Sequence, residues 1–264
     1  MDEAGELVAL GRSLFERGFS VGSAGNISVR VAGGYLITPT NSSLGRLDAA
    51  RISRLDAGWN HIGGDKPSKE VFMHRAVLTA RPDAGSVVHL HSTHATAIAC
   101  LAAIGDTAPI PPLTPYFVMR VGRTLPVLPY HRPGDPAMEA GIHEAAKTAR
   151  AVLLANHGPV VSGATLRDAV AAAEELEEAA RLALLLRGLN PRALTPFSPA
   201  SAERGKAQAP SDRSFHEPRR RHHTCPAARH SHPLVAARLC RYGGGRRGAA
   251  RGAGRWPLGR LLLQ

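Results

Sequence analysis

The chain has 264 residues, of which 44% are apolar, and a formal net charge of +12. This length is enough for one sizeable domain with a hydrophobic core, and three cysteines without a CxxC motif argue against both a disulfide framework and a thiolate zinc site. The acidic N-terminal segment MDEAGELVAL lacks the features of a signal peptide, and no apolar run approaches the roughly 20 residues that span a bilayer. We therefore expect a soluble, cytoplasmic protein without a membrane segment.

The positive charge is concentrated at one end of the chain. Residues 1–200 contain 19 Lys and Arg against 18 Asp and Glu, whereas residues 201–264 contain 14 against 3. After about Phe197 the hydrophobic periodicity stops and Arg, Gly, Ala, Pro and His dominate. We therefore expect a folded domain over 1–197 and a disordered, low-complexity tail over 198–264. Because GC-rich codons read out of frame give such a composition, we hypothesise that the tail arises from a frameshift.

The N-terminal part of the sequence predicts a helix, a hairpin and a second helix. The first helix covers 2–17, with leucines at helical spacing on one face. The glycine-rich segment GSAGNISVRV then runs from a loop into a strand, and Gly33-Gly34 forms a hairpin turn into the next strand. The second helix begins near Ser68 and ends before Pro82.

The following part predicts buried strands alternating with helices. GSVVHLHS is a short strand, with Ser92 or Thr93 capping the helix behind it. The proline-rich segment 108–122 is expected to be irregular. AVLLANHG is a second buried strand that stops at Gly158-Pro159, and a helix over 165–188 begins with a capping box.

Three histidines stand close together in the apolar segment SVVHLHSTHA. Alternation along a strand directs His89 and His91 to the same face, with Cα atoms about 6.6 Å apart. Two imidazoles at that spacing can bind one zinc ion, and His157 is the best candidate for a third ligand. Three histidines and an open position are typical of a catalytic zinc site. The alternative is a chance pattern on a solvated face. We expect His94 to have a packing or supporting role.

A second group of residues indicates a phosphate site. Ser68, Lys69 and Glu70 stand at a predicted helix N-terminus, where unpaired N–H groups suit a phosphate and the lysine adds positive charge. The segments AGNIS and TPTNSS offer further backbone and hydroxyl donors. The alternative for each segment is an ordinary turn or cap. With the histidines they predict a metal site beside a phosphate site.

These motifs together resemble the class II aldolase/adducin family. The resemblance covers about residues 3–196 and implies a three-layer αβα fold with a central, largely antiparallel sheet between helices, assembled as a homotetramer. Within the family, four segments are most similar to the 3-oxo-tetronate 4-phosphate decarboxylases: HLHSTH, PPLTPYFVMRVG, PYHRPGDP and LLLRGLNPRALTP. The family motifs themselves are GNIS, TPTNSSLGRLD, GDKPSKE, HLHSTH and LLANHGPVVSG.

The resemblance also implies roles for individual residues. His89, His91 and His157 match the ligands of one zinc ion per subunit. Glu70 matches the catalytic acid/base, which can also contact the metal when no substrate is bound. The positions that hold the substrate phosphate match Gly25, Asn26, Thr40, Asn41, Ser68 and Lys69. Asn41 stands where relatives often have glycine, and no counterpart is evident for a C-terminal tyrosine that contributes to the aldolase site.

The function implied by the resemblance is zinc-dependent decarboxylation of 3-oxo-tetronate 4-phosphate to dihydroxyacetone phosphate and CO₂, in the catabolism of acid sugars. The substrate partner would be a small phosphorylated sugar acid. Three alternatives remain: a fuculose-phosphate type of aldolase, a non-catalytic adducin-like interaction domain, and nucleic-acid binding by the basic tail. The three histidines argue against the non-catalytic domain. Nucleic acid is the partner that we least expect.

Overall fold

The computed structural model describes residues 2–194. The predicted tail, 198–264, lies outside the described residues, and so do its basic and aromatic side chains. Within the described part, one eight-stranded sheet has the order β4-β3-β2-β1-β5-β8-β7-β6. Every neighbouring pair is antiparallel except β6 and β7, which are parallel. The predicted largely antiparallel sheet is therefore confirmed. The strands are β1 (Asn26–Val31), β2 (Gly34–Ile37), β3 (Ser53–Asp56), β4 (His61–Gly63), β5 (Ser86–His89), β6 (Val127–Leu128), β7 (Ala151–Leu154) and β8 (Gly158–Gly163).

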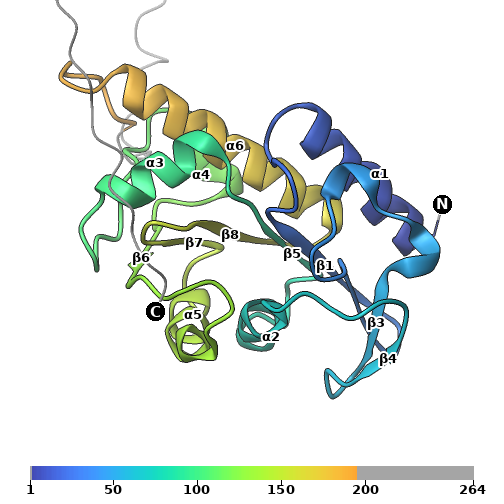
Figure 1. Cartoon of the computed structure of the whole chain (residues 1–264). Coiled ribbons are helices and arrows are strands. Elements are labelled where there is room, and N and C mark those ends of the chain that lie inside the picture. Colours follow the sequence, from blue (N-terminus) through green and yellow to red (C-terminus); the bar gives the residue numbers. More distant parts are fainter. Residues whose placement is uncertain (1, 195–264) are drawn as a thin grey trace, which may run out of the picture. The chain divides into compact units, whose positions relative to one another are not determined.

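Helices cover both faces of the sheet and give the three layers that the resemblance implied. One face carries α1, α3, α4 and α6, and the other carries α2 and α5 (Figure 1). None of the described helices combines the length and the apolar content needed to cross a membrane. The helices are α1 (Glu3–Glu16), α2 (Val71–Ala80), α3 (Thr93–Leu101), α4 (Pro115–Arg120), α5 (Glu139–Ala146) and α6 (Leu166–Leu185).

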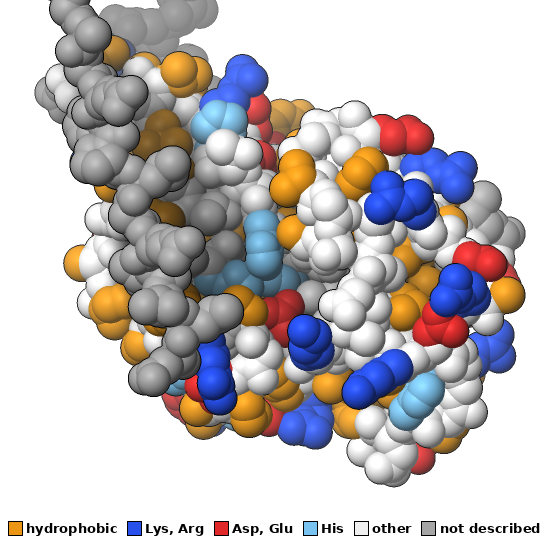
Figure 2. Space-filling view, in the orientation of Figure 1, with side chains coloured by type: hydrophobic (Ala, Val, Ile, Leu, Met, Phe, Trp, Pro, Cys, Tyr) orange, Lys and Arg blue, Asp and Glu red, His pale blue; other side chains and the backbone are white. Residues whose placement is uncertain are grey.

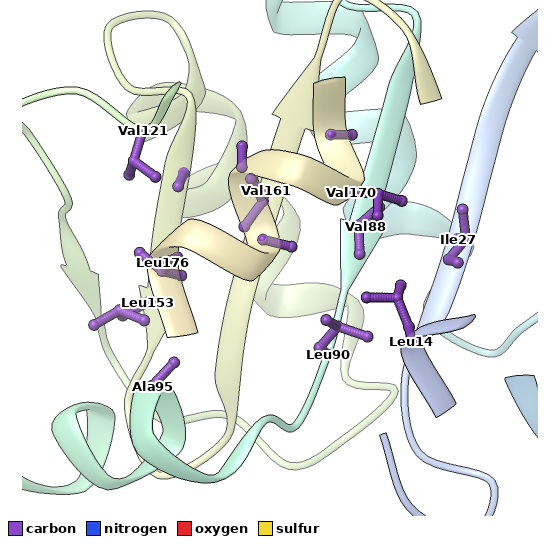
Figure 3. Packing of buried hydrophobic residues seen from close by; sticks show 14 of the residues in the cluster. Leu14, Ile27, Val88, Leu90, Ala95, Val121, Leu153, Val161, Val170 and Leu176 are labelled. Carbon is purple, nitrogen blue, oxygen red and sulfur yellow. The ribbon is translucent and has the colours of Figure 1, made fainter. Parts of the chain in front are cut away.

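Side chains of the central strands point alternately into two separate hydrophobic cores, one on each face of the sheet. Val88 and Leu90 pack in the larger core against α1 and α6, where Figure 3 shows them near Leu14 and Val170. Val87 points the other way, into the smaller core beneath α2 and α5. Because side chains of a strand alternate between faces, His89 lies on the same side as Val87 and towards α2.

Two helix ends agree with the sequence. Asp2 caps α1 by accepting a 2.8 Å hydrogen bond from the Gly5 N–H. At the start of α6, Thr165 and Asp168 form the predicted capping box, in which each side chain accepts a bond from the other residue's backbone N–H. These bonds satisfy amide groups that a helix N-terminus leaves free.

Three predicted boundaries are wrong. The segment 108–122 is not wholly irregular, because Pro115 opens the short helix α4 at a position where a missing N–H costs no hydrogen bond. Gly158-Pro159 does not end a strand but begins β8, since proline is tolerated at a strand start. α2 begins at Val71, so Ser68 lies just before the helix.

Candidate metal and phosphate site

Three neighbouring segments bring the predicted histidines together. β5 ends at His89, and His91 follows two residues later rather than inside the strand as expected. His157 lies in the tight turn between β7 and β8 and not in a strand. β8 pairs with both β5 and β7, so this turn and the end of β5 meet at one edge of the sheet.

The side chains of the three histidines converge on one point. His91 Nε2 lies 3.0 Å from His89 Nε2 and 3.0 Å from His157 Nε2. One ligand atom from each histidine lies within 4.8 Å of the other two. Three nitrogen ligands of a tetrahedral ion, each about 2.0–2.1 Å from it, are about 3.3 Å apart. The observed spacing is therefore close to that of a metal site.

The histidines also have the protonation state that a metal needs. Burial, together with the neighbouring His157 and His91, holds the pKa of His89 well below its ordinary value. Burial likewise lowers the pKa of His91 and of His157. The Pro159 carbonyl accepts a 2.8 Å bond from His89 Nδ1, which leaves the Nε2 lone pair directed into the cluster. Neutral imidazoles with converging lone pairs fit a divalent metal ion.

Glu70 completes the cluster from the N-terminus of α2. Its Oε1 lies 3.5 Å from His157 Nε2, and its Oε2 lies 3.7 Å from His89 Nε2. Asn26 Nδ2 donates a 2.7 Å hydrogen bond to Oε2. The side chain is almost buried, with 11% of its surface exposed, so its carboxylate faces the histidines and not bulk water.

The six residues that match phosphate-binding positions line one cavity beside the histidines. The cavity has a volume of about 170 Å³ and also reaches Glu70 and His91. Figure 2 shows histidine side chains in a hollow on this face, near an acidic and a basic group. No described carboxylate forms a salt bridge with Lys69, whose side chain is exposed, so its positive charge is available for an anion. The cavity lining includes Gly25, Asn26, Thr40, Asn41, Ser68 and Lys69.

Two backbone positions in this cavity have unusual conformations. Gly25 has a φ of +82°, and a Cβ atom there would lie 2.9 Å from the His89 carbonyl oxygen. Asn41 has a φ of 57°. Glycine adopts this left-handed region freely, and asparagine tolerates it better than most residues do. Asparagine is therefore compatible with the backbone at this position, for which the resemblance implied a glycine.

The residues around the site have supporting roles, one of them expected and the others not assigned from the sequence. His94 does not join the triad, because its Nδ1 lies 2.8 Å from Glu177 Oε1 in a contact that also caps α3. Pro133 and Gly134 line the cavity from a loop that the sequence analysis did not assign to the site. His74 lies fully buried on α2 and contacts the Asn26 side chain, a link that no local pattern could have indicated because the two residues are far apart in sequence.

The chain is similar to several known proteins. Residues 5–184 match the family model described as the class II aldolase and adducin N-terminal domain. A 3-oxo-tetronate 4-phosphate decarboxylase from Haemophilus influenzae is 50% identical over 202 residues, which are 76% of this chain and 96% of the relative. An L-fuculose phosphate aldolase from Escherichia coli is 36% identical over 63% of this chain and 75% of its own length. The crystal structure of a putative aldolase/epimerase/decarboxylase from Klebsiella pneumoniae superposes with a TM-score of 0.70 at 48% identity, covering 73% of this chain and 93% of that one.

Proposed function

Because the chain belongs to the class II aldolase and adducin family, we propose that it decarboxylates 3-oxo-tetronate 4-phosphate to dihydroxyacetone phosphate and CO₂. The observation that carries this proposal is the 50% identity to a decarboxylase of that name over nearly the whole length of the relative. The aldolase relative matches less closely and over a smaller share of both chains. The enzyme would thus be a carbon–carbon lyase that acts in acid-sugar catabolism.

We assign His89, His91 and His157 as the ligands of one zinc ion. The support is the spacing of their Nε2 atoms and their neutral state, and zinc accepts three histidines with a fourth position open to substrate. A bound zinc ion would supply Lewis-acid chemistry by stabilising negative charge on the C3 oxygen as CO₂ leaves. Glu70 lies near enough to contact the same ion when no substrate is present.

We assign the proton transfer to Glu70. As the C1–C2 bond breaks, the bonding electrons move towards the C3 oxygen, and C2 must then receive a proton. The Glu70 carboxyl group can take that proton from water and pass it to C2, because it lies beside the histidine cluster and is nearly buried. Only one proton enters for each CO₂ that leaves, so the reaction needs no oxidant or reductant.

The cavity next to Glu70 would hold the substrate phosphate. Lys69 supplies a positive charge, and the Ser68 hydroxyl, which accepts a 3.2 Å bond from the Glu70 N–H, still has a hydrogen to donate. Gly25 exposes backbone where a side chain would collide. Anchoring the phosphate in a cavity that also reaches His91 and Glu70 would orient the scissile bond. Asn26, Thr40 and Asn41 complete this proposed site.

The experiment offers 3-oxo-tetronate 4-phosphate to the purified, zinc-loaded protein and measures CO₂ and dihydroxyacetone phosphate together. We expect equal amounts of the two products. In a parallel reaction, L-fuculose 1-phosphate tests the second candidate function, which the similarity to the aldolase supports. Cleavage of fuculose 1-phosphate without CO₂ from the tetronate would move the assignment to the aldolases. A protein that retained no zinc after loading and showed neither activity would favour the adducin-like interaction domain.

Three further assignments are proposals from the sequence. A homotetramer would appear in light scattering at four times the mass of one chain, and a cytoplasmic location would appear in cell fractionation. The division into a catalytic domain over 1–197 and a separate tail gains support from the Haemophilus relative. The alignment spans 96% of that relative but only 76% of the present chain, so about a quarter of this chain has no aligned counterpart.

A further inference from the structure

A continuous hydrogen-bonded chain leads from the interior of the protein to Glu70. Ser28 Oγ lies 2.7 Å from His74 Nδ1, His74 Nε2 contacts Asn26 Oδ1, and Asn26 Nδ2 lies 2.7 Å from Glu70 Oε2. Ser28 and His74 have no exposed surface, and Asn26 has 5%. These hydrogen bonds therefore connect the buried interior of β1 and α2 with the proposed active site, and only the Asn26 and Glu70 end reaches the cavity.

The chemistry of the groups fixes the direction of every bond in this chain. An ionised carboxylate only accepts hydrogen bonds, so Asn26 must turn its NH₂ group towards Glu70 and its oxygen towards His74. Only a donor can satisfy that oxygen, so His74 must carry its hydrogen on Nε2. His74 Nδ1 is then an acceptor, and Ser28 must donate its hydroxyl hydrogen to it.

The burial of His74 strengthens this conclusion. Desolvation lowers the pKa of His74 to about 3, so the ring is neutral at physiological pH and carries a single N–H. A neutral ring with its hydrogen on Nδ1 could still donate to the Ser28 hydroxyl, but it would place two lone pairs opposite each other at Asn26 Oδ1. Only one of the two neutral forms therefore fits.

We propose that His74 is a positioning residue, whose Nε2–H sets the orientation of the Asn26 amide and thereby holds Glu70 Oε2 as a permanent hydrogen-bond acceptor. This inference rests on the proposed function, in which Glu70 moves the proton. With Oε2 engaged, Oε1 is the oxygen that carries the proton, and it is the one that lies 3.5 Å from His157 Nε2. His74 thus determines which carboxylate oxygen faces the substrate.

Two substitutions of His74 separate positioning from simple filling of space. The Gln amide reaches as far from the backbone as imidazole Nε2, so His74→Gln can still donate to Asn26. The Asn amide reaches only as far as Nδ1, so His74→Asn keeps a contact with Ser28 and loses the one with Asn26. Both variants place a neutral amide in the same buried position, which makes them a matched pair.

The kinetic experiment compares both variants with wild type, normalised to zinc content and to folded protein. Loss of a residue that supports a metal site typically costs about 10–100-fold in activity, so we expect His74→Asn to lower kcat by that factor with less effect on KM. His74→Gln should restore at least about a tenth of the wild-type kcat, well above His74→Asn. Equal kcat values for the two variants would overturn the positioning role. So would a loss of kcat that simply parallels the fall in each variant's melting temperature.

A second measurement tests the chain without any activity. The ¹⁵N chemical shifts of the wild-type histidines report which ring nitrogen carries hydrogen, and assignment through the His74→Gln spectrum identifies the relevant signals. We expect His74 to carry hydrogen on Nε2 alone. Hydrogen on Nδ1 would overturn the inference. If wild type released no CO₂ while this tautomer was observed, the proposed function would fail and the hydrogen-bonded chain would stand.

Discussion

Glu70 Oε1 lies 3.5 Å from His157 Nε2, although the two residues are far apart in the sequence. The N-terminus of α2 supplies the carboxylate, and the turn between β7 and β8 supplies the imidazole. The turn lies at the edge of the sheet where β5 ends, and α2 begins beside the same edge. An acid/base group is thereby placed beside a cluster of metal-binding character, and neither element could provide this arrangement alone.

We predict that Glu70→Gln removes most of the activity and leaves the metal in place. Glutamine keeps the shape and can accept the bond from Asn26 through its amide oxygen, but it cannot transfer a proton. General acid–base catalysis typically contributes about 10²–10⁴-fold, so kcat should fall within that range. Zinc content measured by elemental analysis should stay near that of wild type. A fully active variant would exclude Glu70 from the mechanism.

We predict that His89→Ala and His157→Ala each abolish stoichiometric zinc. Each substitution removes one of three proposed nitrogen ligands, and the remaining two cannot hold the ion as tightly. His94→Ala is the matched control, because its ring contacts Glu177 rather than the cluster. That variant should keep most of its zinc in equilibrium dialysis. Equal loss in all three variants would mean that the triad is incorrectly assigned.

The sequence predicted the fold and the central histidines for identifiable reasons. The HxH spacing and the Gly158-Pro159 pair after His157 are local patterns, and local patterns determine much of where a side chain points. His91 lies beyond the end of β5, yet it still meets His89 because the extended backbone continues past the last ladder hydrogen bond. The phosphate site is likewise indicated by local patterns, the predicted helix N-terminus at Ser68 and two donor-rich segments, but the roles of its individual residues come from the family resemblance.

Other features could not be predicted because they depend on packing between distant segments. The local sequence predicts only that His74 belongs to a helix. Its contact with Asn26 depends on the packing of α2 against β1. The short strand β6 has two residues, too few for a periodic signal. The capping of α3 comes from Glu177 on α6 and not from Ser92, so no local capping motif exists there.

We predict that Gly25→Ala is more damaging than Gly33→Ala. Both glycines have left-handed backbone, with φ of +82° and +81°. A side chain in that conformation costs roughly 1–2 kcal/mol in unfolding free energy, and this cost should apply to both variants. A Cβ at Gly25 would also lie 2.9 Å from the His89 carbonyl, whereas nothing lies within 4 Å at Gly33.

The additional clash should move the backbone of a proposed metal ligand. We therefore expect Gly25→Ala to lose stability beyond the cost seen in Gly33→Ala, and to lose zinc affinity and kcat/KM as well. Urea denaturation and zinc titration measure the two effects. Equal behaviour of the two variants would show that the close approach of Gly25 to His89 has no consequence.

We predict that the C-terminal tail is dispensable for folding. This prediction rests on composition alone, because residues 198–264 lie outside the described part of the chain. A segment with so few apolar residues cannot offset the entropy of ordering by burial. Limited proteolysis should leave a core that ends near residue 197, and a chain truncated there should have the same melting temperature. A protease-resistant tail would contradict this expectation.

Finally, we predict that buried His74 makes the protein less stable as the pH falls below about 6.5. The pKa of His74 is about 3 in the folded protein and 6.5 when the chain is unfolded. Above pH 6.5 the ring is neutral in both states and has no effect. Below pH 6.5 the His74 ring binds a proton in the unfolded chain but not in the folded protein. The unfolding free energy therefore declines by up to about 1.4 kcal/mol per pH unit until the pH nears 3.

The measurement is urea denaturation from pH 7.5 to 5 with a chelator present, so that metal binding does not contribute. His74 should account for a loss of about 2 kcal/mol over that range. His89, His91 and His157 also have lowered pKa values, and they contribute in the same direction in both wild type and variant. Glutamine does not titrate, so the unfolding free energy of His74→Gln should fall by about 2 kcal/mol less than that of wild type between pH 7.5 and 5. Parallel pH curves for the two proteins would mean that His74 is protonated as readily in the folded state as in the unfolded one, and the directional hydrogen-bonded chain to Glu70 would then be untenable.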